Sequence, residues 1–281
     1  MQKAVECFYP GGNFPAISVT GSECALDCKH CSRKYLEGMI RATTASDLLS
    51  VAEAIAERGA SGFLLSGGVD RNGRVPLAEF ADTIKEIKVT TDLRINAHIG
   101  LSNEREVDCL VKSGIDSFSV DLYGSGETIK EVLGLDTTPE DYFAVLGNLM
   151  NAGAPIVAPH ICVGIHGGEL KGELKVIDRL SMNPPDVLVL ISLIPTKGTA
   201  YESVPPPGRD AVLSVIRKAR QDLPETKLLL GCMRSKLDRS SEYDFLDAGL
   251  DGIVLPATRT VERLRAEGVS VKKRAICCSF M

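Results

Sequence analysis

Three cysteines near the start of the chain are close enough in sequence to bind one metal centre. They are Cys24, Cys28 and Cys31 in the segment CALDCKHC, separated by three and then by two residues. Thiolates are the natural ligands of iron–sulfur clusters, and a short loop can wrap three of them around one cubane. Because the loop has no fourth cysteine, one iron would stay open to a substrate. The spacing therefore predicts a 4Fe–4S cluster with an open iron.

A zinc site is the alternative for the same segment. Structural zinc takes four closed ligands, usually from paired cysteines. His30 is the available fourth ligand, but the spacing of the three cysteines is not the paired one. Iron is therefore the favoured metal.

Strand-like and helix-like segments that position this loop alternate along almost the whole chain. Short apolar runs predict strands at residues 16–20, 62–66, 93–99, 117–122, 156–165, 186–194, 227–230 and 252–255. Apolar residues at helical spacing predict helices at residues 46–58, 77–87, 104–112, 139–151, 172–180, 210–221, 242–248 and 260–267. Strands that alternate with helices over short connections indicate a parallel α/β sheet. Eight such units indicate a closed (β/α)8 TIM-type barrel, with an open doubly wound sheet as the alternative.

We expect a single domain over residues 1–281. Its core would span about residues 16–268, and the terminal segments 1–15 and 269–281 would extend over the barrel mouth. The mouth is the end of such a barrel at which the chemistry takes place, because the loops after the strands meet there.

Six of the nine cysteines lie outside the triplet. Four of them, Cys7, Cys232, Cys277 and Cys278, fall outside the apolar stripes of the predicted helices, and Cys232 follows a predicted strand. Chain ends folded over the mouth would bring these four together. The pattern predicts a second, auxiliary iron–sulfur cluster, and the alternative is a set of unconnected, inert thiols.

The cysteine triplet after the first predicted strand resembles that of the radical S-adenosylmethionine (SAM) superfamily, and the resemblance covers essentially the whole chain. It implies that Cys24, Cys28 and Cys31 hold a 4Fe–4S cluster whose open iron chelates SAM. An electron from the cluster then splits SAM and gives a 5′-deoxyadenosyl radical, which removes hydrogen from the substrate.

The resemblance also implies which residues bind SAM. Ser66, Gly67 and Gly68 end the second predicted strand, where the family has a glycine-rich turn that receives the SAM amino group. Asp121 and Tyr123 end the fourth, where related enzymes bind the ribose. A carboxylate there can accept charge-assisted hydrogen bonds from both ribose hydroxyls.

Within the superfamily the chain is most similar to biotin synthase and its homologues. The segments 231–234 (GCMR) and 248–253 (AGLDGI) match the closing part of that barrel. Where biotin synthase has cysteine ligands for a second cluster, this chain has Asn96 and His160, which argues against biotin synthesis.

A more specific resemblance is to one component of the two-component lipoyl synthase of archaea and some bacteria. Residues 8–18 (FYPGGNFPAIS) contribute to it. In the tail, Ser279 matches a serine that ligates the sacrificial cluster of single-chain lipoyl synthases. The resemblance implies that the enzyme inserts sulfur into unactivated C–H bonds of a protein-bound octanoyl chain. A biotin-synthase-like mutase or ring-forming enzyme without an auxiliary cluster is one alternative, and a non-catalytic metal-binding barrel is another.

The resemblance to lipoyl synthase implies several partners. The substrate would be an octanoylated lipoyl-carrier protein or a peptide from it, the second component a homologous radical SAM enzyme, and the electron donor a protein such as ferredoxin or flavodoxin.

Composition narrows the class of protein further. A formal net charge of −5, a pI of about 5.5 and the absence of Trp argue against nucleic-acid binding. No apolar run approaches the roughly 20 residues that span a bilayer. The first ten residues lack a signal peptide. We therefore expect a cytoplasmic protein.

Overall fold

Parallel β-strands build a single curled sheet in the computed structural model, which describes residues 4–235 and 239–281. The strands are β1 (Ala4–Phe8), β2 (Ala16–Ser18), β3 (Ile40–Arg41), β4 (Gly62–Ser66), β5 (Arg94–His98), β6 (Ser117–Asp121), β7 (Val157–Val163), β8 (Val187–Ser192), β9 (Lys227–Leu230), β10 (Gly252–Val254) and β11 (Ser270–Arg274). Their order across the sheet is β11-β1-β10-β9-β8-β7-β6-β5-β4-β2-β3. The (β/α) TIM-type fold class is thereby confirmed.

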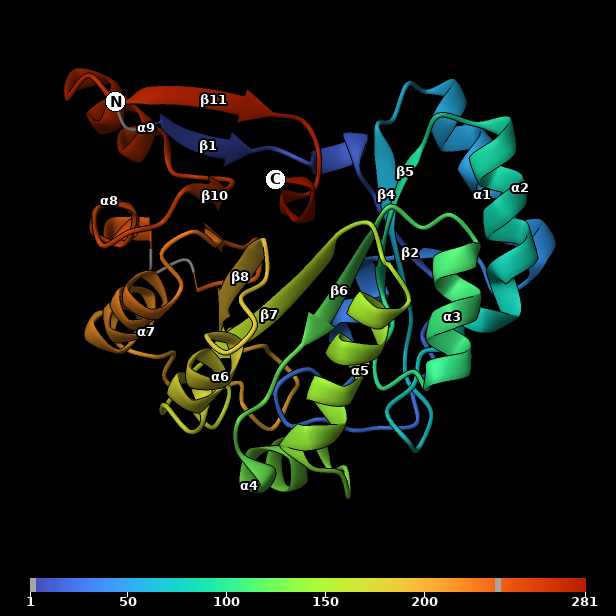
Figure 1. The fold of residues 1–281 in the computed structure, drawn as a ribbon, viewed down its shortest axis with the longest axis horizontal. Coiled ribbons are helices and arrows are strands. Elements are labelled where there is room, and N and C mark those ends of the chain that lie inside the picture. Colours follow the sequence, from blue (N-terminus) through green and yellow to red (C-terminus); the bar gives the residue numbers. More distant parts are fainter. Residues whose placement is uncertain (1–3, 236–238) are drawn as a thin grey trace.

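Helices connect the strands and cover the outer face of the sheet (Figure 1). They are α1 (Ala45–Glu57), α2 (Ala81–Thr90), α3 (Glu104–Lys112), α4 (Gly126–Thr128), α5 (Pro139–Asn151), α6 (Glu173–Leu180), α7 (Arg209–Asp222), α8 (Glu242–Asp247) and α9 (Thr258–Ala266). None of the described helices is long and apolar enough to cross a membrane.

The sheet stays open instead of closing into a barrel. Its edges are β3 and β11, and no pairing joins them among the described strands. The sequence did not predict β1, β3 or β11. The register pairs β1 with both β10 and β11, so the two terminal segments lengthen the sheet side by side (Figure 1). The terminal residues therefore form strands of the sheet wall.

The two faces of the sheet differ in what they bury. Successive residues of a strand point to opposite faces. Phe63, Ile95 and Phe118 point outward into the main core under the helices. The inward residues of β1, β7, β8, β9 and β10 form a second, smaller apolar cluster that contains Phe8 and Val189. Inward residues of β5 and β6 are polar instead, so the interior has an apolar wall and a polar wall.

Residues 275–281, which we call the C-terminal plug, lie against the start of the strands. The carbonyl of Ala275 accepts hydrogen bonds from Asn13 Nδ2 (2.6 Å) and Ser61 Oγ (3.0 Å). The Phe280 ring packs edge-on against Phe14, with centroids 5.8 Å apart, and under the Arg94 guanidinium. All these partners precede or begin strands.

The expected position of the tail over the mouth is therefore wrong. The plug closes the amino-terminal end of the sheet because its partners stand there, whereas the mouth lies at the carboxyl ends of the strands.

A buried ion pair fixes the segment after β9. Arg234 Nη2 lies 2.7 Å from Glu242 Oε1, and the side chains are 5% and 0% exposed. Glu242 also accepts hydrogen bonds from the Ala257 amide and the Thr260 hydroxyl. The pair ties the segment that carries Cys232 to α8.

Replacing Arg234 with Met should therefore leave a buried, uncompensated carboxylate. Breaking such a pair costs about 3–5 kcal/mol. We expect Arg234→Met to lower the free energy of unfolding by that amount in chemical denaturation. Arg209→Ala removes an exposed ion pair between α7 and Asp244 of α8 and should cost about 1 kcal/mol or less. Equal losses in the two variants would contradict this account.

Candidate active site

The cysteine loop, residues 24–31, follows β2 at the carboxyl ends of the strands. Backbone hydrogen bonds join the Ala25 amide to the Val69 carbonyl (2.8 Å) and the Lys29 amide to the Val132 carbonyl (2.9 Å). Val132 belongs to a π-helical turn, Ile129–Leu133, whose Leu133 carbonyl also faces the Cys28 thiol at 3.5 Å. Turns of this rare type are frequent at functional sites. The loop is thus fastened from two sides.

The thiols of the loop interact with one another. A hydrogen bond from Cys28, assisted by His30, lowers the pKa of Cys31 to about 4. The same bond, together with burial, raises the pKa of Cys28. Cys24 is close enough to contribute to that rise. The loop therefore holds a thiolate beside two further thiols, the donor set that a cluster requires.

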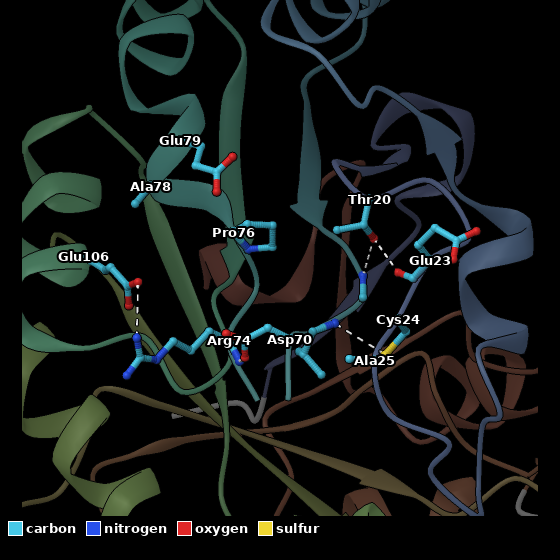
Figure 2. A pocket seen from close by; sticks show the side chains of 12 residues that line it. Thr20, Glu23, Cys24, Ala25, Asp70, Arg74, Pro76, Ala78, Glu79 and Glu106 are labelled. Carbon is cyan, nitrogen blue, oxygen red and sulfur yellow. Dashed lines mark hydrogen bonds and ion pairs between the residues drawn. The ribbon is translucent and has the colours of Figure 1, made fainter. Parts of the chain in front are cut away.

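The Gly67–Gly68 turn after β4 packs against the cysteine loop. The Gly68 amide donates to Thr20 Oγ1 (2.7 Å), and the Val69 amide points at Cys24 Sγ (3.4 Å) (Figure 2). A Cβ at position 68 would lie 2.0 Å from the Glu23 carbonyl oxygen and 2.6 Å from the Cys24 Cβ. Only glycine allows this close approach.

A cavity of about 480 Å³ opens beside this turn (Figure 2). Cys24 and Gly68 line it together with carboxylates of Glu23, Asp70, Glu79 and Glu106 and the guanidinium of Arg74. Arg74 and Glu106 form an ion pair at 3.8 Å. The carboxylates outnumber the cation, which suits a ligand with an amino group.

Asp121 ends β6 on the inward face, between the loop and the interior. In the part of the chain that the structure describes, its carboxylate accepts no hydrogen bond. The side chain of Asp121 is half-buried. Burial is the main cause that raises the pKa of Cys162 and of Tyr123, and the negative charge of Asp121 raises both pKa values further. The carboxylate is therefore available to a ligand at the mouth.

Tyr123 is placed differently from Asp121. Its ring packs edge-on against Tyr142, with centroids 4.9 Å apart. Ser66 donates a hydrogen bond from its hydroxyl to the His98 carbonyl (3.3 Å) and ends β4 beside the glycine turn. The charge of Cys28 adds to the rise in the pKa of Tyr123, so that ring lies near the cysteine loop. The roles of Ser66, the glycine turn, Asp121 and Tyr123 in SAM binding stay predictions.

Cys277 lies in the interior at the level of the plug. Its sulfur accepts hydrogen bonds from Ser279 Oγ (3.3 Å) and Asn96 Nδ2 (3.6 Å). Ser119 Oγ donates to Asn96 Oδ1 (3.0 Å), which orients the amide so that its NH₂ group faces the sulfur. A hydrogen bond from Cys278 and these donors lower the pKa of Cys277 to about 6.

Cys232 and Cys278 are neighbours of Cys277. Desolvation raises the pKa of Cys232, and the charge of Cys277 adds to that rise. Cys278 is buried in the smaller apolar cluster, and its pKa is raised by its bond to Cys277 and by burial. Of the two adjacent cysteines, Cys277 is the one with polar partners.

The prediction that Cys7 joins these cysteines is wrong. Cys7 points outward into the core under the helices, while its neighbour Phe8 points inward. Burial raises the pKa of the Cys7 thiol to about 11. The sequence alone did not reveal β1, and the strand's alternation decides the face.

Sequence reasoning missed two features of the interior. His98 was not singled out, and the π-helical turn that fastens the loop has no recognisable signal in the sequence. His98 and His160 face each other with ring centroids 5.1 Å apart. Burial lowers the pKa of both, that of His98 to about 4, so both imidazoles are neutral.

Comparisons with known proteins identify the family of the chain. The family model for the radical SAM superfamily matches residues 18–178. The biotin synthase of Polaromonas naphthalenivorans (strain CJ2) is 22% identical over 84% of this chain and 69% of its own length. That of Helicobacter hepaticus is 26% identical over 85% of this chain and 84% of its own.

A similar fold is found in a solved structure. The X-ray structure of the FeFe-hydrogenase maturase HydG from Carboxydothermus hydrogenoformans superposes with a TM-score of 0.69 at 18% identity, over 99% of this chain and 69% of that one.

The chain belongs to the radical SAM superfamily and is a distant relative of the biotin synthases. Membership implies a 4Fe–4S cluster and SAM. The residues present fit the cluster: the loop gathers three thiols, Gly68 leaves room only for backbone beside Cys24, and the Nδ1 atom of His30 is buried without a partner. The half-buried carboxylate of Asp121 can accept hydrogen bonds from SAM.

Gly68→Ala should disturb the cluster site, because the new methyl group would collide with the backbone of the cysteine loop. Overpacking of this kind costs about 1–3 kcal/mol. We expect reduced iron content after anaerobic reconstitution and a lower melting temperature. Gly147→Ala, in open space on α5, should keep full iron and gain stability. Normal iron in Gly68→Ala would refute the steric argument.

Asp121→Ala should weaken SAM binding and leave the iron content unchanged. Losing charge-assisted hydrogen bonds worth roughly 1.5–3 kcal/mol lowers affinity about tenfold to a hundredfold. Equilibrium binding of SAM to the reconstituted variant measures this, with the exposed Asp178→Ala as control. Unchanged affinity would make Asp121 a structural acid.

Proposed function

We propose that the protein is a radical SAM sulfurtransferase that inserts sulfur into unactivated C–H bonds of a protein-bound octanoyl chain. It would act as one component of a two-component lipoyl synthase, beside a homologous partner enzyme. The observation that carries the proposal is a second group of thiols. Cys277 lies inside the sheet with Asn96 and Ser279 as hydrogen-bond donors, and the exposed Cys232 after β9 is close enough for the charge of Cys277 to raise its pKa.

Hydrogen removal is assigned to the mouth. With its cluster and SAM bound, the site would supply a 5′-deoxyadenosyl radical, which can remove hydrogen from an unactivated carbon. Cys24, Cys28 and Cys31 would hold the cluster. Ser66, the glycine turn and Asp121, with Tyr123 at the rim, would orient SAM.

Sulfur needs a source separate from the triplet, because loss of sulfide there would destroy the radical source. The plug offers such a place. Asn96 and Ser279 donate hydrogen bonds to Cys277, and Ser119 keeps the Asn96 amide in the donating orientation. These contacts support a role for Cys277, with Cys232, as a ligand of an auxiliary iron–sulfur cluster. Ser279 would donate a hydrogen bond to the Cys277 sulfur, and Cys278 would pack among the apolar side chains of the smaller cluster.

The substrate would enter through the mouth. Ile194 and Met233 are half-buried and follow β8 and β9, where the Ser192 amide bonds to the Met233 carbonyl. Apolar side chains there suit an extended octanoyl-lysine of a lipoyl-carrier protein or peptide. A ferredoxin or flavodoxin would supply electrons.

The test is an anaerobic incubation with SAM, reductant and an octanoyl-lysyl peptide, with the homologous partner present, read by mass spectrometry. The reconstituted wild type should form 5′-deoxyadenosine and a thiolated peptide. Cys277→Ala should still cleave SAM but form no thiolated peptide, because only the sulfur site is lost. Cys109→Ala, a cysteine on α3, is the matched control and should behave as wild type.

The outcome separates this proposal from its rival, a mutase or ring-forming enzyme with a single cluster. About four irons per chain, the content of one cubane, would support the rival, whereas about six to eight support a second cluster. A thiolated product from Cys277→Ala would contradict the role of the plug.

A further inference from the structure

Two inward histidines lie between the mouth and the plug, and the proposed function leaves them unused. His160 is 8% exposed. Its Nδ1 lies 2.9 Å from the Ala158 carbonyl oxygen. A carbonyl only accepts, so Nδ1 carries the proton and Nε2 has a free lone pair. Among residues 4–235 and 239–281, neither Nε2 of His160 nor the ring of His98 has a hydrogen-bond partner.

Each histidine is the next inward residue, on its own strand, after a residue that meets the plug. Inward positions on one strand recur every second residue, about 6.6–6.8 Å apart. His98 is the next inward residue after Asn96, whose amide reaches Cys277. His160 is the next inward residue after Ala158, which packs in the same apolar cluster as Cys278 and Cys277. Both imidazoles therefore lie on the mouth side of the residues that meet the plug, with His160 one inward register position farther toward the mouth than His98.

Cysteine ligands are too few for a closed cluster at this level. Cys7 points to the outer face, and Cys278 is embedded among apolar side chains. Cys232 and Cys277 remain. Imidazole nitrogen is a good ligand for iron, and two histidines can replace two cysteines on one iron of a two-iron cluster.

We infer that His98 and His160 complete, with Cys232 and Cys277, an iron–sulfur cluster with two cysteine and two histidine ligands inside the sheet. The inference rests on the second cluster of the proposed function and names its remaining ligands.

The spacing of the two rings fits binding to one metal atom. With metal–nitrogen bonds of about 2.0–2.1 Å and tetrahedral angles, two imidazole rings on one metal have centres roughly 5 Å apart. The observed separation is 5.1 Å. Among residues 4–235 and 239–281, no three of the four proposed ligand residues have donor atoms that all lie within 4.8 Å of one another, so they do not form a site for a single metal ion held by three of them.

The experiment uses the full chain in which the triplet is removed (Cys24→Ala, Cys28→Ala, Cys31→Ala), so that only the second cluster is observed. The protein is reconstituted anaerobically with iron and sulfide. Iron content is measured, and pulsed EPR of the reduced cluster is compared between protein with ¹⁴N-histidine and with ¹⁵N-histidine. We expect retained iron and nitrogen couplings that change with the isotope.

Added substitutions assign the ligands. His98→Ala or His160→Ala should abolish the couplings of that ring and most of the iron. His160→Cys should retain iron but lose that nitrogen coupling, because a thiolate replaces the imidazole. Cys109→Ala, on α3 and outside the proposed site, should change nothing. In the chain with an intact triplet, His160→Ala should still cleave SAM, which shows that it folds.

Two other results of this experiment would overturn either the histidine ligands alone or the second cluster as a whole. If the histidine variants keep their iron and no nitrogen coupling exists, while Cys277→Ala loses the iron, the histidine ligands are refuted and the second cluster stands. If the chain without the triplet holds no iron at all, the second cluster and its histidine ligands are both refuted.

Discussion

The parallel direction of the strands is the constraint on which the rest of the molecule depends. All strands end at one rim, so the loops that follow them, including residues 24–31, meet there. Alternation along each strand then sorts side chains to two faces. Cys7 and Phe8 are adjacent in sequence, yet one lies in the outer core and the other inside the sheet. Chemistry is possible only for residues at the rim or on the inner face.

Because the sheet is open, its interior must be closed by another part of the chain. The C-terminal plug does this at the start of the strands, through hydrogen bonds to Ala275 and stacking of Phe280. It thereby carries Cys277 into the interior from the side opposite to the mouth. Two thiol groups then lie at different depths of one enclosure, with Asp121 and the histidine pair between them. This separation is what a reaction needs if sulfur is to be given up without damage to the radical source.

Much of this arrangement was predictable from the sequence. Residues 62–66, 104–112, 139–151 and 227–230 form strands and helices with the boundaries that the sequence predicted. Capping residues mark the starts of the two helices, and glycines follow the two short apolar strands. The position of the cysteine loop after β2 followed from the same pattern. Short polar strands could not be predicted from the sequence. β11 has the sequence SVKKR, and its pairing with β1 is a contact between the two ends of the chain. Without β1, the outward direction of Cys7 could not be known, nor could the entry of the plug from the far end.

The central claim is that sulfur held inside the sheet beside Cys277 is transferred to the substrate. It is tested most directly by reconstituting the enzyme with ³⁴S-sulfide, removing unbound sulfide, and running one turnover with SAM, reductant, the partner enzyme and octanoyl-lysyl peptide. The account predicts ³⁴S in the thiolated peptide formed by wild type, and no thiolated peptide from Cys277→Ala although SAM is cleaved. A thiolated peptide without ³⁴S, or equal ³⁴S transfer by Cys277→Ala, would contradict it.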